Sequence, residues 1–228
     1  MKPEPSYEEF LQQWSESYTS KNYDNSLAGY LLNKSHEWSE MEFDTNDEFD
    51  KVLEVGAGTS IHLNSVQHQF NEYWVTDLNL PMLDMISEKH THVDKKVITQ
   101  QEDATSLSFP DNSFDRLIAA HVLEHIYRPH EVLREWTRVV KPGGVITLVL
   151  PCDPGVAWRL GRYISTRGKF TREGIDYDYW MAREHVNAIN NLFALVRYYF
   201  SSVKEIWRPC YVPSMDINLF YITHITVE

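Results

Sequence analysis

The sequence predicts an α/β fold in which seven strands form a mostly parallel sheet with an antiparallel last strand. Two observations predict this fold. Short apolar runs, typical of buried strands, alternate with stretches whose apolar residues have helical spacing. Two further apolar runs end the chain with no helix between them, which is typical of an antiparallel hairpin. Because helices join the earlier strands, those strands should be parallel and the sheet covered on both faces.

Seven apolar runs are expected to form the strands. In chain order they cover residues 51–55, 73–76, 96–99, 114–119, 145–150, 203–210 and 218–227. Helices are expected at residues 7–14, 27–38, 61–70, 81–89 and 128–140. Lys141-Pro142-Gly143-Gly144 should end the last of these helices. The acidic region 37–50 is expected to be a solvated connection between the N-terminal helices and the first strand.

Length and composition favour one domain of 228 residues. We expect a helical N-terminal cap in residues 1–45, a core in 50–150, a helical insertion in 152–191, and a last helix with the closing strands in 192–228. The 33 acidic and 21 basic residues give a net charge of −12, which argues against nucleic acid as a partner.

Three further features bear on where the protein works. No apolar run approaches the roughly 18 residues of a membrane span, and the N-terminus lacks the apolar core of a signal peptide. Cys152 and Cys210 are too few for a disulfide framework. We therefore expect a cytoplasmic protein, either a monomer or a homodimer.

The loops that follow the first three strands indicate a ligand site, because ligands of open α/β sheets bind beyond the carboxyl ends of the strands. Gly56 and Gly58 let the first loop turn tightly and approach a ligand. Asp77 follows the second strand at a spacing at which an acid can accept hydrogen bonds from ribose hydroxyls. Asp103, after the third strand, has the chemistry to meet an adenine amine, or it is a turn residue.

The ordered set of motifs resembles the class I S-adenosylmethionine-dependent methyltransferases, in their small-molecule, type 11 branch. The resemblance covers about residues 50–151 and implies a doubly wound, Rossmann-like sheet. It rests on the segments 52–58, 102–104, 109–115, 121–125 and 133–144, together with Asp77. One departure is Ser60, which stands where the family has its third glycine.

The resemblance implies S-adenosylmethionine as cofactor and assigns residues to its parts. The glycine loop would hold the methionine end, with His121 near the methionyl amine, and the acids after the second and third strands would bind ribose and adenine. The cofactor-binding residues expected on this basis are Glu54, Gly56, Ala57, Gly58, Asp77, Leu78, Asp103, Ala104 and His121.

Three other functions are open to a chain with this sequence. A nicotinamide-dependent oxidoreductase would need glycine where Ile61 stands, so this function is disfavoured. His121-Val122-Leu123-Glu124-His125 matches the pattern of inverted zinc peptidases, but it directly follows a strand and shows no third ligand. We therefore expect a short turn and no metal site, with a zinc hydrolase as an alternative. A homologue that binds the cofactor without catalysis is also an alternative.

The acceptor is expected to be a small molecule, with an anionic sugar or glycolipid intermediate as a candidate. His121 and His125 are the candidate bases, because an imidazole can take a proton near neutral pH. Aromatic and basic residues alternate in the insertion, a composition that suits stacking and anion pairing. From it we select Arg159, Arg162, Tyr163 and Trp180 as candidate substrate residues, on a cover that closes over the acceptor.

Overall fold

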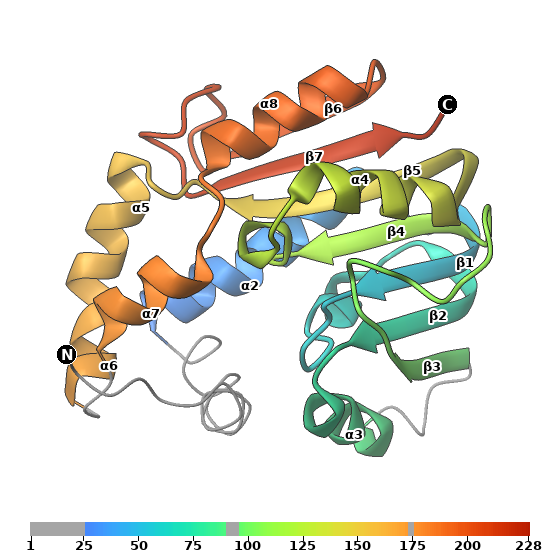
Figure 1. The fold of residues 1–228 in the computed structure, drawn as a ribbon, viewed down its shortest axis with the longest axis horizontal. Coiled ribbons are helices and arrows are strands. Elements are labelled where there is room, and N and C mark those ends of the chain that lie inside the picture. The colour runs from blue at the N-terminus through green and yellow to red at the C-terminus, as the bar shows by residue number, and fades with distance from the viewer. Residues whose placement is uncertain (1–25, 90–95, 173–175) are drawn as a thin grey trace.

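The computed structural model describes residues 26–89, 96–172 and 176–228. The helix expected at residues 7–14 lies outside these ranges. Within them, seven strands form one sheet in the order β3-β2-β1-β4-β5-β7-β6 (Figure 1). The strands are β1 (Glu48–Val55), β2 (Gln69–Asp77), β3 (Lys96–Gln101), β4 (Phe114–Ala120), β5 (Val140–Pro151), β6 (Val203–Arg208) and β7 (Phe220–Thr226).

The pairing of the strands confirms the predicted fold class. Strands β1 to β5 are parallel to one another, and β7 runs antiparallel to both β5 and β6. The predicted hairpin therefore forms, and its second strand lies between β5 and β6 while its first strand is at the edge. The order reverses beside β1, so β1 and β4 flank the switch point where such sheets bind ligands.

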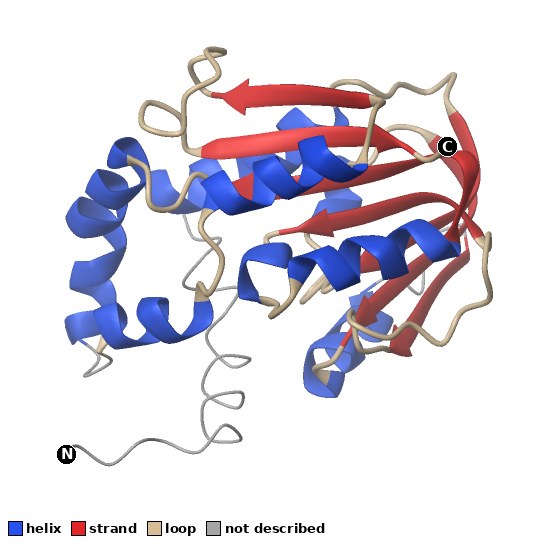
Figure 2. Ribbon diagram, turned by 45° about the horizontal axis from the view of Figure 1, so that its top comes forward, coloured by secondary structure: helices blue, strands red, loops and turns tan. Residues whose placement is uncertain are grey.

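Helices cover both faces of the sheet (Figures 1 and 2). In the described residues the helices are α2 (Leu27–Glu40), α3 (Leu80–Lys89), α4 (Pro129–Val139), α5 (Val156–Gly161), α6 (Arg167–Arg172), α7 (Tyr177–Glu184) and α8 (Ile189–Tyr199). Helices α4 and α8 lie on one face and α2 on the other. Short helical turns are η1 (His62–Ser65), η2 (Leu123–His125) and η3 (Arg162–Thr166). Among the described residues, no helix has the length and apolarity to cross a membrane.

Helix α4 shows why the sequence builds these layers. Pro129 occupies its first turn, where a missing N–H costs nothing. Its apolar residues Val132, Leu133, Trp136 and Val139 share one face and are buried in the main core. The indole N–H of Trp136 donates to the carbonyl oxygen of Ala104 at 2.9 Å, which anchors the loop after β3 to this helix.

The helix expected at residues 61–70 is wrong. Only the single 3-10 turn η1 forms there, and the chain enters β2 at Gln69. Asn64, Ser65 and Val66 are weak helix formers, and the following residues pair in parallel with β1 from Glu48 onward. The backbone bonds gained in the sheet, with Phe70 and Tyr73 buried, outweigh a helix with a poor apolar face.

The solvated connection expected at residues 37–50 is also wrong in its first part. Helix α2 continues to Glu40, whose side chain is fully buried. Arg116 on β4 donates to both carboxylate oxygens of Glu40, at 2.9 and 2.6 Å. Glu40 can be buried because this long-range ion pair compensates its charge.

The insertion lies beyond the ends to which β1, β2 and β4 point (Figure 1). It consists of α5, the π-helical turn η3, α6 and α7. This is the side of the sheet on which the glycine loop also lies.

Candidate functional site

The glycine loop has the backbone that its sequence predicts. Gly56 and Gly58 adopt φ angles of 62° and 55°, in the left-handed region that favours glycine. A Cβ atom on Gly56 would lie 2.6 Å from a methyl carbon of Val122. The loop therefore packs directly against the segment that follows β4, and only glycine fits at position 56.

Asp77 joins the end of β2 to this loop. Its two carboxylate oxygens accept hydrogen bonds from the backbone N–H groups of Gly58 and Asn79, each at 2.8 Å. Burial raises the pKa of Asp77, against the opposing effect of these hydrogen bonds. Each oxygen retains a lone pair for a further donor. Leu78, the next residue, exposes 54% of its surface beside the carboxylate.

Glu54 lies at the inner end of the loop. Its carboxyl is buried and accepts hydrogen bonds from the hydroxyls of Tyr73 at 2.8 Å and Ser60 at 3.2 Å. Burial raises its pKa, so a cation placed here would be favoured.

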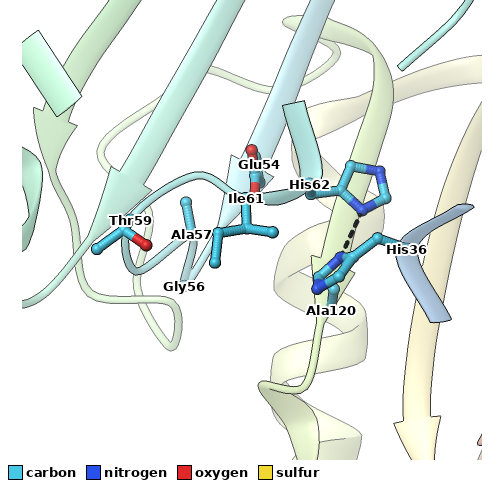
Figure 3. A pocket seen from close by; sticks show the side chains of 8 residues that line it. All are labelled: His36, Glu54, Gly56, Ala57, Thr59, Ile61, His62 and Ala120. Atoms are coloured by element: carbon cyan, nitrogen blue, oxygen red, sulfur yellow. Dashed lines mark hydrogen bonds between the residues drawn. The ribbon is translucent and has the colours of Figure 1, made fainter. Parts of the chain in front are cut away.

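Glu54 shares a small cavity with His36 of α2 and His62 of η1 (Figure 3). The two imidazoles are joined through their Nδ1 atoms at 3.1 Å. The cavity volume is about 10 Å³, room for about one water. A larger ligand would therefore have to displace lining side chains such as His36.

Asp103 forms the turn that the sequence left open as an alternative. Its Oδ1 atom accepts from the backbone N–H and the hydroxyl of Thr105, at 2.8 and 2.7 Å. The Asp103 side chain is exposed, and Ala104 beside it is half-buried. The backbone N–H of Glu102 donates to the carbonyl of Asp77 at 3.1 Å. This hydrogen bond joins the ends of β2 and β3, so Asp77 and Asp103 lie at the same edge of the sheet.

His121 directly follows β4 and has a left-handed conformation, with a φ of 60°. Its Nε2 atom lies 2.9 Å from the hydroxyl of Ser35, and its ring meets the ring of His36 edge to face at 5.7 Å. Burial, with the neighbouring His125, lowers the pKa of His121 to about 3. The imidazole is therefore neutral at neutral pH.

The rest of the His-x-x-Glu-His motif forms the short turn η2, as expected. His125 donates from Nδ1 to the carbonyl oxygen of Glu184 at 3.0 Å, and burial lowers its pKa to about 3. Glu124 is 2% exposed, and burial raises its pKa to about 8. The turn brings His125 against His185, with ring centroids 4.8 Å apart.

The four candidate substrate residues on the cover have different surroundings. Arg162 donates to Asp153 at 2.8 Å and stacks over Tyr177, so it is engaged within the cover. Trp180 packs against Tyr179 and carries Arg183 over its ring. Arg159 and Tyr163 are exposed.

Sequence reasoning missed His36, His62 and His185. None of these residues stands in a recognisable motif, and each reaches the site through a contact between distant segments. The nearest signal in the sequence is the unusual number of histidines, ten in 228 residues.

Comparison with known proteins bears on what this site does. Residues 53–148 match the family model of a methyltransferase domain. The chain is 33% identical to a ubiquinone/menaquinone biosynthesis C-methyltransferase of Bordetella parapertussis over 129 residues, which are 52% of this chain and 50% of that protein. It is 32% identical to a phosphatidylethanolamine N-methyltransferase of Cereibacter sphaeroides over 101 residues, 43% of this chain and 49% of that protein.

Residues 53–148, rather less than half of the chain, are thus similar to a methyltransferase domain. Its fold agrees with that of a methyltransferase from Aquifex aeolicus that depends on S-adenosylmethionine, with a TM-score of 0.57 at 14% identity over 98% of this chain and all of that one. The chain spans about half the length, or less, of the curated relatives it matches.

Class I methyltransferases use S-adenosylmethionine as methyl donor, and the residues around the glycine loop fit that cofactor. Glu54 is a buried acid next to the glycine loop, where the ammonium of the methionine part would compensate its burial. Asp77 retains acceptor capacity for the ribose hydroxyls. The size of the cavity adds one condition, which is that His36 or its neighbours shift when the cofactor enters.

Proposed function

We propose that the chain transfers a methyl group from S-adenosylmethionine to a small-molecule acceptor. The observation that carries the proposal is the hydrogen bond from the backbone N–H of Gly58 to Asp77. It fixes the glycine loop and the candidate ribose acid together at the switch point of a methyltransferase domain.

Each residue of this edge has a proposed task. The backbone of Gly56, Ala57 and Gly58 holds the methionine part, and Glu54 pairs with its ammonium. Asp77 accepts from the ribose hydroxyls, Leu78 packs on the adenine ring, and Asp103 with Ala104 addresses the adenine edge. When bound, the cofactor supplies an electrophilic methyl group on a sulfonium, so the chain must mainly align the acceptor and exclude water.

His121 is the residue that we propose to receive a proton from an acceptor hydroxyl. It lies next to His36 on the cavity and is neutral at neutral pH, so it can accept a proton. Its lowered pKa of about 3 makes it a weaker base than an ordinary imidazole. His125 is the second candidate, because its Nδ1 donates to the carbonyl oxygen of Glu184 and leaves the lone pair on Nε2.

For the acceptor we propose an anionic lipid-like molecule, such as a glycolipid intermediate. Val156, Leu160 and Ile164 are exposed at four-residue spacing along α5 and η3, which forms an apolar stripe on the cover. Arg159 stands in the same segment and supplies positive charge. The names of two relatives point to quinone and phosphatidylethanolamine acceptors, which also join a polar group to an apolar part.

The test of methyl transfer uses S-adenosylmethionine labelled in its methyl group and a cell extract separated into lipid and water-soluble fractions. We expect label in the lipid fraction. Label in the water-soluble fraction would contradict the acceptor class, and binding of the cofactor without any labelled product would indicate a non-catalytic binder.

Replacing Asp77 with Ala should weaken S-adenosylmethionine binding about 10- to 100-fold. This corresponds to roughly 1.5–3 kcal/mol for hydrogen bonds to a charged group. Isothermal titration calorimetry measures the effect. Asp84→Asn, on the exposed side of α3, is the matched control and should bind as the parent does. Parental affinity in Asp77→Ala would place the ribose elsewhere.

Replacing Arg159 with Ala should raise the acceptor KM by about tenfold, the value of one charge-assisted contact. Affinity for the cofactor should be unchanged, because Arg159 lies on the cover. Steady-state kinetics with the lipid fraction measures the acceptor KM, and calorimetry measures the affinity for the cofactor. If the variant lost cofactor affinity and acceptor affinity equally, the cover would not be an acceptor surface.

A further inference from the structure

We propose that Glu124, His125 and His185 bind a divalent transition-metal ion beside the methyltransferase site. The sequence showed only part of this set, since His185 is 60 positions beyond His125. In the structure one potential ligand atom from each of the three side chains lies within 4.8 Å of the others.

The turn η2 and the end of α7 are held together by several hydrogen bonds. The side-chain amide of Asn187 donates to the carbonyl oxygens of Leu123 at 2.9 Å and Ile126 at 2.7 Å. Its backbone N–H donates to the carbonyl of Glu124 at 3.1 Å. The approach of His185 to Glu124 and His125 is therefore built into the fold.

Both histidines are oriented as metal ligands usually are. Nδ1 of His125 donates to the carbonyl of Glu184, and Nδ1 of His185 donates to Asp153, each at 3.0 Å. Since a carbonyl oxygen and a carboxylate only accept, the proton lies on Nδ1 and the Nε2 lone pair is available. Partners of this kind fix the tautomer in metal sites. Arg162 also donates to Asp153 and holds that carboxylate in place.

Glu124 supplies the independent observation. It is 2% exposed, and its Oε2 atom has no hydrogen-bond partner among the described residues. Its Oε1 atom lies 3.9 Å from Nε2 of His125. A buried oxygen without a partner is costly, and a cation held by both carboxylate oxygens of Glu124 together with His125 would satisfy it.

The spacing and donor set suit a particular class of ion. Ligands at about 2.1 Å from one ion in tetrahedral geometry lie roughly 3.4 Å apart, so shifts of about an ångström would close the site. Two imidazoles and one carboxylate favour Zn²⁺ or Fe²⁺ over Mg²⁺ or Ca²⁺, which prefer oxygen ligands.

Three protein ligands leave a position for water or an acceptor oxygen. Nδ1 of His121 lies 3.9 Å from Glu124, and His121 in turn contacts His36 on the cavity. The ion would therefore orient the acceptor next to the transferred methyl group. This last step rests on the proposed function, whereas metal binding itself does not.

The test is a titration of the chelator-treated chain with ZnCl₂, CoCl₂ or MgCl₂, without S-adenosylmethionine. We expect one Zn²⁺ per chain by calorimetry, a visible d–d absorption with Co²⁺, and no binding of Mg²⁺. Glu124→Gln and His185→Gln should each lower Zn²⁺ affinity at least about 100-fold. Asp153→Asn, which removes the charge of the carboxylate that orients His185 and pairs with Arg162 but leaves the three ligands in place, should lower it about 10- to 100-fold.

His130→Gln is the matched control, because His130 lies on α4 outside the cluster. Its Zn²⁺ affinity should equal that of the parent. Parental affinity in both Glu124→Gln and His185→Gln would overturn the inference, as would loss of binding in His130→Gln. Circular dichroism identifies a variant that fails to fold. If both ligand variants fail to fold, Asp153→Asn decides, and an affinity and a Co²⁺ spectrum equal to those of the parent would then overturn the inference. Calorimetry with S-adenosylmethionine on the same preparations reports separately on the proposed function.

Discussion

Replacing Arg116 with Met is expected to lower the free energy of unfolding by about 3–5 kcal/mol, because it leaves a buried carboxylate without its main partner. Arg116 and Glu40 are both fully buried and form a bidentate pair. Burial alone would raise the pKa of Glu40, but the charge of Arg116 and the hydrogen bond from His62 hold it well below its usual range. Urea unfolding at neutral pH measures the loss.

Two further variants show whether the loss comes from the unpaired charge. Glu40→Leu combined with Arg116→Met should be less destabilised than the Arg116→Met variant, since no buried charge is then left alone. Arg197→Met removes a bidentate pair with Glu205 at the surface and should cost about 1 kcal/mol or less. If the double variant lost as much free energy of unfolding as Arg116→Met and Glu40→Leu lose together, the two residues would not be energetically coupled.

The ion pair between Glu40 and Arg116 is a feature that the sequence alone did not predict. The strands and the glycine loop were predictable, because an apolar run and a Gly-x-Gly turn are local patterns that need no knowledge of distant residues. Glu40 stands in an acidic stretch that locally resembles a solvated surface. Its burial depends on Arg116, 76 positions later, and no local pattern links the two.

The candidate site divides in the same way. Gly56 and Gly58 come just after β1 and Asp77 ends β2, so their meeting at one edge follows from a parallel sheet. His185 meets Glu124 and His125 only because Asn187 fastens the end of α7 to the turn after β4. The wrong helix at residues 61–70 has a related cause, since pairing with β1 decided that segment and helical spacing did not.

Acidification from pH 6.5 to about pH 5 is expected to destabilise the protein steeply, because several histidines are buried in their neutral form. Burial, assisted by the charge of Arg116, lowers the pKa of His68 and of His224 to about 4 from an ordinary value of 6.5. The unfolded chain binds these protons first, so stability falls as pH decreases below 6.5. Each such group contributes about 1.4 kcal/mol per pH unit within this window.

His224→Gln isolates one of these groups. His224 lies on β7, and its Nδ1 atom is 3.0 Å from the hydroxyl of Thr147, which also accepts from Arg116. The variant should reduce the slope of stability against pH by about 1.4 kcal/mol per unit, or one proton, whatever its stability at pH 7. His130→Gln, at a half-buried position on α4, should leave the slope unchanged. Urea unfolding between pH 5 and 7.5 measures both, and an unaltered slope in His224→Gln would mean that His224 titrates normally in the fold. Carboxylates whose pKa is lowered by the fold, such as Glu40, do not account for this window, because their ordinary pKa of 4.5 lies below it. Glu124, whose pKa is raised to about 8, acts in the opposite direction and offsets about one of the histidines.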